Sequence, residues 1–284
     1  MSSRSIGATS DRFVHSYGPW AVVAGASDGL GAAFVRAVAG CGIDVVAVAR
    51  RGSLLEALKE ECAERFRRTV VPLVADLAEP ESFSRIIEAT GGMDVGLLIY
   101  NAAFVNGGSF LDHQVELHRR IVDVNCIRPM ELAHHFAGLM KAKGRGGIVL
   151  MSSLTSFIGS PYISAYGASK AFNMILAEGL WYELRRSGVD VLASCPGAIT
   201  TPDFIAGYSG KAGFISPPLS TPEEVAFATL EALGRKSIVI PGRMNSILSF
   251  IMRHLLPRRT GVRFMGKTVH DLTSEESPTD APLS

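Results

Sequence analysis

No stretch of this 284-residue sequence is apolar for long enough to cross a membrane. A membrane-spanning helix needs roughly 18 or more consecutive apolar residues, and no segment approaches that length. The opening residues, MSSRSIGATSDRFVHSY, also lack the apolar core of a secretion signal. These absences predict a cytoplasmic protein.

Cysteine and net charge are also scarce. The cysteines are scattered, without the paired spacing of a zinc site or the density of a disulfide framework, so we expect reduced thiols and no metal site. They are Cys41, Cys62, Cys126 and Cys195. Lys and Arg number 28 against 27 Asp and Glu, which gives a net charge of +1. A chain with so little net charge has no overall field to recruit nucleic acid, and a small-molecule partner is favoured.

The sequence does contain short apolar runs at regular intervals. Hydrophobic residues make up 47% of the chain, and the runs alternate with longer amphipathic stretches, as parallel strands alternate with helices. Strands so uniformly apolar must be covered on both faces. The pattern therefore predicts an α/β fold with a single doubly wound parallel sheet, Rossmann-like, with helices on both faces. The seven expected strands are residues 20–26, 43–49, 69–75, 95–101, 147–152, 189–194 and 237–241.

The expected organisation is one catalytic domain with an extension at each end. Residues 1–17 form an N-terminal arm, and residues 18–242 form the Rossmann-fold domain, with a Gly- and Pro-rich substrate loop at 202–218. A basic, amphipathic extension follows at 243–270, and residues 271–284 have the composition of a disordered tail. The extension has three interpretations: a membrane-surface helix, a subunit-contact arm, or a segment packed over the substrate cleft.

A glycine-rich turn follows the first expected strand and precedes a helical pattern. Glycines let the backbone approach a pyrophosphate closely, and the N-terminus of the helix presents free N–H groups and partial positive charge to it. A glycine turn that serves packing alone is the alternative, but the order of strand, turn and helix favours a dinucleotide site. The candidate residues of this turn are Gly25, Ser27, Asp28, Gly29, Leu30 and Gly31.

The end of the second expected strand distinguishes between the two nicotinamide dinucleotides. Sites for NAD place an Asp or Glu there to bind the ribose hydroxyls. This sequence has Ala49 followed by Arg50 and Arg51, and guanidinium groups suit the additional 2′-phosphate of NADP(H). NADP(H) is therefore predicted over NAD(H). Two solvated arginines that open a helix are the alternative, and the carboxylate of Asp28 in the glycine turn weighs against a phosphate nearby.

Ser153, Tyr166 and Lys170 form the candidate catalytic group. Tyr166 and Lys170 lie four residues apart in a helical context, so they project from one face. Reduction of a carbonyl needs a proton on its oxygen as hydride reaches its carbon, and a Tyr of ordinary pKa, about 10, transfers one poorly at neutral pH. We expect the Lys170 ammonium to lower the pKa of Tyr166 and Ser153 to bind the substrate oxygen. Ser153 is preferred over Ser152 because residues alternate in facing along a strand.

These motifs resemble those of the short-chain dehydrogenase/reductase family over most of the chain. The glycine spacing, the segment Tyr100-Asn101-Ala102-Ala103 and the Ser, Tyr and Lys pattern carry the resemblance. It implies Tyr166 as the acid/base, Lys170 as its electrostatic partner and ribose ligand, and Ser153 as the substrate orienter. It also implies a fourth catalytic residue, Asn125. The cofactor contacts that it implies at later strand ends and on the catalytic helix are Asp76, Leu77, Asn101, Ala102, Ala103, Tyr166, Lys170, Pro196, Gly197, Ile199 and Thr201.

Within that family, YGPWAVVAGASDGLG, DVGLLIYNAA and GRMNSILSFIMRHLLP resemble the branch of hydroxysteroid dehydrogenases and long-chain beta-ketoacyl-CoA reductases. The resemblance implies a large lipophilic ketone or alcohol as substrate, with the 202–218 loop as an apolar lid. It also implies a homodimer or homotetramer in which long helices, here about 112–143 and 164–187, pair between subunits. The expected activity is NADP(H)-dependent hydride transfer to or from a carbonyl or secondary alcohol. A sensor or scaffold that binds NADP(H) without turnover is the alternative.

Pro129 lies four residues after Asn125 in a helical pattern. Because proline has no N–H, the main-chain oxygen of Asn125 is expected to lose its helical partner and to hold an ordered water that hydrogen-bonds Lys170. The alternatives are that Pro129 only bends the helix and that Asn125 makes structural hydrogen bonds. Nearby histidines lack accompanying metal ligands and are expected at the solvated surface: His113, His118, His134 and His135.

Overall fold

A seven-stranded parallel sheet forms the centre of the molecule, as predicted, in the order β3-β2-β1-β4-β5-β6-β7. The computed structural model describes residues 6–201 and 219–273. The strands are β1 (Trp20–Ala24), β2 (Asp44–Ala49), β3 (Val70–Val74), β4 (Val95–Tyr100), β5 (Gly146–Met151), β6 (Val189–Ser194) and β7 (Ile238–Val239). The predicted substrate loop, 202–218, lies outside the described residues.

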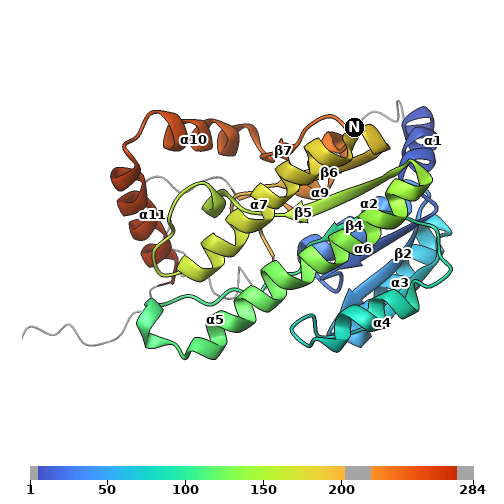
Figure 1. The fold of residues 1–284 in the computed structure, drawn as a ribbon, viewed down its shortest axis with the longest axis horizontal. Helices are drawn as coiled ribbons and strands as arrows, with labels where there is room; N and C mark the ends of the chain where they lie inside the picture. The colour runs from blue at the N-terminus through green and yellow to red at the C-terminus, as the bar shows by residue number, and fades with distance from the viewer. Residues whose placement is uncertain (1–5, 202–218, 274–284) are drawn as a thin grey trace, which may run out of the picture.

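Helices cover both faces of the sheet (Figure 1). Because successive strand residues point to opposite faces, neighbours such as Val22 and Val23 enter different cores. One core packs under α2, α3 and α9, and the other under α4, α6 and α7. The described helices are α1 (Ile6–Tyr17), α2 (Gly29–Gly40), α3 (Gly52–Phe66), α4 (Glu81–Ala89), α5 (Val115–Val122), α6 (Arg128–Lys143), α7 (Ser164–Leu184), α9 (Pro222–Ala232), α10 (Arg243–His254) and α11 (Arg258–Thr273).

The two ends of the chain add helices to this core. The predicted N-terminal arm contains α1, whose Tyr17 is buried and donates a hydrogen bond to Asp190 Oδ2 on β6 at 2.7 Å. The predicted extension forms α10 and α11, which lie together at one end of the molecule (Figure 1). α11 continues to Thr273, three residues into the segment expected as a disordered tail, and residues 274–284 lie outside the described residues. Buried Val269 anchors that last part of the helix.

The sheet order determines where a site can form. β1 pairs with β2 on one side and with β4 on the other. The connection after β1 leads to β2, and the connection after β4 leads to β5, so these two connections leave in opposite directions. In open parallel sheets this reversal opens a crevice at the carboxyl ends of the strands. Each segment in which the sequence predicts a cofactor or catalytic residue follows a strand or lies on a helix next to that edge.

Candidate active site

A cavity of about 490 Å³ lies at the carboxyl edge of the sheet. It brings together 19 of the predicted site residues: Gly25, Ser27, Asp28, Gly29, Leu30, Arg50, Arg51, Asp76, Leu77, Asn101, Ala102, Ala103, Ser153, Tyr166, Lys170, Pro196, Gly197, Ile199 and Thr201. Two predicted residues, Gly31 and Asn125, lie behind the wall. Residues that the sequence did not predict also line it: Ala49, Ala75, Phe104, Arg120, Val124, Met151 and Ser152.

The glycine turn is shaped by close backbone packing. Gly25 has a φ of +81°, in the region that favours glycine, and accepts a hydrogen bond from Asn101 Nδ2 at 2.9 Å. A Cβ on Gly31 would lie 1.7 Å from the main-chain oxygen of Gly25. Gly31 therefore acts from behind the cavity, since only glycine lets α2 approach the turn so closely.

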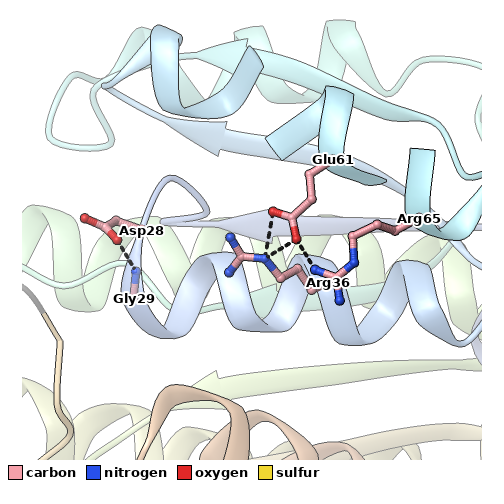
Figure 2. A network of polar contacts seen from close by, with 5 residues as sticks. All are labelled: Asp28, Gly29, Arg36, Glu61 and Arg65. Atoms are coloured by element: carbon pink, nitrogen blue, oxygen red, sulfur yellow. Dashed lines mark hydrogen bonds and ion pairs between the residues drawn. The ribbon is translucent and has the colours of Figure 1, made fainter. Parts of the chain in front are cut away.

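A carboxylate caps the N-terminus of α2, next to the glycine turn. Asp28 is the N-cap, and its Oδ1 accepts a hydrogen bond from the Gly29 N–H at 2.7 Å (Figure 2). Its other oxygen lies 3.4 Å from Nη2 of Arg51, whose guanidinium also donates to Ser27 Oγ at 3.3 Å. The glycine turn and the end of β2 are thus joined by a solvent-exposed ion pair at the place where the sequence predicts a phosphate site.

A second polar cluster connects the two helices next to this turn (Figure 2). Arg36 of α2 donates to both carboxylate oxygens of Glu61 of α3, at 2.9 and 3.0 Å. Arg65 also contacts Glu61, and both guanidinium groups lower the pKa of its carboxyl against the opposing effect of burial, which is the largest contribution. The cluster holds α3 against α2, so it supports the segment that carries Arg51.

Asp76, at the far end of the cavity, has both carboxylate oxygens engaged. Oδ1 accepts a hydrogen bond from the Ala78 N–H at 3.0 Å, and Oδ2 forms an ion pair with Arg120 Nη2 at 2.8 Å. The Arg120 guanidinium also lies 5.3 Å from the centre of the Phe104 ring. Arg120 follows Arg119 in an ordinary helical pattern, so nothing in the sequence distinguishes it as a cavity residue.

Ser153 and Tyr166 meet in the cavity, as predicted from their pattern. Burial raises the pKa of Tyr166 to about 12, and the hydrogen bond with Ser153 opposes that shift. Ser153 Oγ also accepts from the Thr155 N–H at 3.2 Å. Ser152 points elsewhere, because its hydroxyl donates to the main-chain oxygen of Lys170 at 2.7 Å.

Lys170 departs from the expected arrangement. Its ammonium donates to the main-chain oxygen of Met151 at 2.9 Å and lies 5.6 Å from the centre of the Tyr166 ring. Burial and the opposing hydrogen bond with Ser153 account for the pKa of Tyr166, and the lowering expected from Lys170 stays a prediction. Burial also lowers the pKa of Lys170 itself to about 8. Both groups are therefore governed by desolvation more than by each other.

Asn125 lies in a π-helical turn, Asp123–Ile127, between α5 and α6. Its side chain is fully used in structural hydrogen bonds: Oδ1 accepts from the Phe104 N–H at 2.7 Å, and Nδ2 donates to Phe104 O and Ser169 Oγ, both at 2.9 Å. Pro129 offers its main-chain oxygen no N–H. That oxygen accepts instead from Asn173 Nδ2 at 2.9 Å, a donor that the sequence did not predict.

α10, at the start of the predicted extension, supports the cavity wall. A Cβ on Gly197 would lie 2.9 Å from the amide of Asn245, a contact of the kind expected for an extension packed over the substrate cleft. The histidines are not all solvated: His118 is half-buried, stacks on Phe110 at 4.3 Å and hydrogen-bonds its carbonyl oxygen, and His113 contacts Asn106. These two rings brace the segment before α5.

Within residues 6–201 and 219–273, no three His, Cys, Asp or Glu side chains lie close enough to hold a metal ion. None of the helices in those ranges is both long and apolar enough to cross a membrane.

Comparison with known proteins identifies the family. The short chain dehydrogenase family matches residues 19–206. The chain is 30% identical to 7beta-hydroxysteroid dehydrogenase from Collinsella aerofaciens, over 90% of this chain and 98% of the relative. It is 35% identical to very-long-chain 3-oxoacyl-CoA reductase from Podospora anserina, over 61% of this chain and 53% of that protein.

Solved structures agree. A structure from a study of 7beta-hydroxysteroid dehydrogenase stereoselectivity superposes with a TM-score of 0.83 at 30% identity, over 89% of this chain and 98% of the other. A short-chain dehydrogenase from Sphingobium yanoikuyae in complex with NADPH gives a TM-score of 0.70 at 30% identity, over 78% and 87%. Because the family match includes the glycine turn and the helix of Tyr166 and Lys170 together, the chain belongs to the short chain dehydrogenase family, oxidoreductases that act on CH–OH groups.

Proposed function

We propose that the protein is an NADP(H)-dependent oxidoreductase in which Tyr166 is the acid/base. The observation that carries the proposal is that Tyr166, Ser153 and Lys170 line the same cavity as the glycine turn. A dinucleotide laid along that turn would extend toward the tyrosine. The ends of β4 and β6 lie between them and contribute Asn101 and Gly197 to the wall.

The residues at the adenine end fit NADP(H). Gly25 and Gly31 leave the backbone of the turn without side chains, as close approach of a pyrophosphate requires. Beyond the turn, Arg50 and Arg51 line the cavity where an NAD site would have a carboxylate. Their guanidinium groups would hold the 2′-phosphate by charge-assisted hydrogen bonds. The solved relative that contains NADPH supports this assignment.

The bound nicotinamide would supply or accept the hydride. Ser153 would hydrogen-bond the substrate oxygen and hold it beside Tyr166. With a pKa of about 12, Tyr166 is protonated at neutral pH and ready to give its proton to that oxygen, which favours reduction. Lys170, with a pKa of about 8, is mostly an ammonium at neutral pH. It would offer its positive charge to the ribose and to the tyrosine oxygen as negative charge develops there.

The relatives point to a lipophilic ketone or alcohol as the substrate class. Their names include 7beta-hydroxysteroid dehydrogenase and very-long-chain 3-oxoacyl-CoA reductase. A steroid and a long-chain acyl group share a large apolar surface, so an apolar binding region is the feature that both would need.

The direct test is oxidation of NADPH or NADH by the purified protein with a panel of steroid and long-chain ketones, followed by absorbance. We expect turnover with at least one ketone and a higher kcat/KM for NADPH than for NADH. An alternative is a sensor or scaffold that binds NADP(H) without turnover. NADPH binding in a calorimeter, combined with no turnover on the whole panel, would favour that alternative.

A further inference from the structure

The two most buried side chains of α10 are polar, whereas most of its large apolar side chains are exposed and Leu248 and Met252 are half-buried. The buried residues of this helix are Asn245 and Ser249, which are 1% and 3% exposed. The Asn245 amide donates to the main-chain oxygen of Pro241 at 3.2 Å and backs Gly197 in the cavity wall. This is the reverse of a helix that packs on a protein core, whose buried face is normally apolar.

The outer face of α10 is correspondingly apolar. Met244, Ile247 and Ile251 repeat at helical spacing, with Phe250 beside them and Leu255 just beyond the helix end. Met244, Ile247, Phe250 and Leu255 are each more than half exposed. We refer to these five residues as the α10 patch. A patch of large apolar side chains gathered on one helix marks a contact surface, because scattered apolar residues would not line up in this way.

The charge around the α10 patch has one sign. Residues 243–270 contain six of the 28 Lys and Arg of the chain and none of the 27 Asp and Glu, so the rest of the chain carries a net charge of −5. Arg243 begins α10, and Arg253 lies near its end, where its guanidinium is 4.4 Å from the centre of the Phe157 ring. In α11, exposed cations continue along one side at a spacing of four residues: Arg259, Arg263 and Lys267.

We propose that α10 and α11 dock the protein on an anionic lipid surface. The α10 patch would enter the boundary between headgroups and acyl chains, and the flanking arginines would reach the lipid phosphates. Each cation near an anionic leaflet adds to the attraction, and residues 243–270 contain no Asp or Glu that would oppose it. The inference is independent of the proposed cofactor and substrate, because it rests only on this surface.

A second copy of the chain is a poorer occupant of the same patch. In a two-fold contact both copies present the same residues, so the arginines around one patch would face those around the other. No carboxylate within residues 243–270 is available to neutralise them. An anionic membrane supplies both the apolar phase and the opposite charge.

Docking would also place the catalytic segment close to the membrane. Phe157, on which Arg253 lies, follows Ser153 by four residues. A pocket of about 370 Å³ lies between α11 and Pro161 and Tyr162, which precede α7. Its lining residues are Pro161, Tyr162, Val262, Arg263, Gly266 and Lys267.

The test is co-sedimentation of the full chain with vesicles, without substrate or turnover. We expect binding to vesicles of equal parts phosphatidylcholine and phosphatidylglycerol, weak binding to phosphatidylcholine alone, and loss of binding in high salt. The double variant Ile247→Ser with Phe250→Ser should lower the partition coefficient on the mixed vesicles by about tenfold or more. The double variant Arg258→Gln with Arg259→Gln should also weaken binding to them and make it less sensitive to salt.

Matched controls use exposed residues outside the α10 patch. Phe227→Ser on α9, at a side chain that is 69% exposed, and Arg186→Gln after α7 should bind the mixed vesicles as the wild type does. Melting temperatures verify that each variant is folded. The proposal is overturned if Ile247→Ser with Phe250→Ser binds the vesicles unchanged, or if the wild type binds both vesicle types equally. It is also overturned if the wild type binds neither vesicle type, and a lower sedimentation coefficient of this variant would then mean that the patch covers another copy.

Discussion

Burial, more than neighbouring charge, sets the resting protonation of the two central side chains. It raises the pKa of Tyr166 to about 12 and lowers that of Lys170 to about 8, so burial opposes the charged form of each, although Lys170 is still mostly an ammonium at neutral pH. The tyrosine is consequently a proton donor at rest. For the tyrosine to act as a base in the reverse direction, the Lys170 ammonium would have to turn from the Met151 carbonyl, to which it is bonded here, toward the tyrosine oxygen.

Tyr166→Phe removes the proposed proton donor and leaves the glycine turn unchanged. We expect turnover to fall by about 10²-fold or more, while NADPH affinity stays nearly the same. Steady-state kinetics and NADPH titration by fluorescence measure the two effects separately. Ser152→Ala is the control, because that hydroxyl bonds the main chain of the same helix without meeting Tyr166. Near-normal turnover of the Phe variant would show that another group transfers the proton.

The lowered pKa of Lys170 predicts a specific dependence of stability on pH. Its pKa is about 8 in the folded chain, against its usual value of 10.5, so between these pH values the unfolded chain binds more protons than the folded one. The free energy of unfolding should therefore rise as the pH increases from 8 to 10, by up to about 3 kcal/mol, relative to Lys170→Met. Denaturant unfolding of both proteins at several pH values measures the difference. Parallel curves would mean that the ammonium is solvated in solution.

Asp28 places a negative charge beside the proposed 2′-phosphate site. Asp28→Asn keeps an oxygen that can accept from the Gly29 N–H and removes the charge that pairs with Arg51. NADPH should bind about three- to tenfold more tightly, with little change for NADH. Calorimetric titration with both dinucleotides tests this, and Asp112→Asn, outside the cavity, is the control. An equal gain for NADH would place the effect on the pyrophosphate instead.

At the scale of elements, the π-helical turn between α5 and α6 organises the site from behind. It carries Asn125, whose side chain fixes Phe104 and Ser169 and whose carbonyl accepts from Asn173 of α7. Tyr100 at the end of β4 donates to Val124 O at 2.5 Å, so the turn is bonded to the sheet as well. The turn thus links β4, α6 and α7 next to the catalytic pair.

A double-mutant cycle tests how this turn is held. Asn173→Leu leaves the buried Asn125 carbonyl without its side-chain donor, and we expect a loss of about 1–3 kcal/mol in the free energy of unfolding. Pro129→Ala supplies an N–H that an ordinary helical turn would bring to the same carbonyl. Asn173→Leu should therefore be less costly in the Pro129→Ala background. Equal costs in both backgrounds would mean that the turn keeps its π geometry.

The elements of the fold follow from sequence pattern more fully than the contacts within the site. The strand ends agree with the sequence-based prediction to within two residues, since short, uniformly apolar runs that alternate with amphipathic stretches are typical of a parallel sheet covered on both faces. The cavity residues follow because strand ends in a parallel sheet meet at one edge. Arg120, Asn173 and Asn245 were missed because each depends on a tertiary contact between distant segments. The bond of Lys170 to the Met151 carbonyl depends on side-chain packing that no spacing encodes.

At the scale of the whole molecule, α7 presents an outer face that the described chain leaves uncovered. Phe172, Ile175 and Tyr182 recur along it at helical spacing and are all exposed, Ile175 at 61%. α6 runs next to it across the same face of the sheet (Figure 1). The Arg185 guanidinium lies 3.9 Å from the centre of the Tyr182 ring, and α7 also carries Glu178 and Glu183. This stripe therefore has charges of both signs around it, unlike the α10 patch, and suits pairing with the same helix of another copy.

We therefore expect α7 to form the main contact of a homo-oligomer. Ile175→Asp would bury a carboxylate next to its symmetry mate, which should convert the wild-type dimer or tetramer into a smaller species. Sedimentation velocity at several protein concentrations gives the result. Phe250→Ser on α10 is the control and should leave the oligomer unchanged. A monomeric wild type, or an oligomer that survives Ile175→Asp, would contradict the assignment.

The hydrogen bond from Tyr17 to Asp190 has a consequence for synthesis on the ribosome. It joins residues 173 positions apart, so α1 leaves the exit tunnel long before its partner strand exists. At typical translation rates, about 10 to 35 s pass before that strand is made. β4 and β5, which α1 also contacts, are made within that interval, but the Tyr17 hydroxyl still lacks its Asp190 partner. Among the described elements, α1 can therefore complete its contacts only after β6 has been translated.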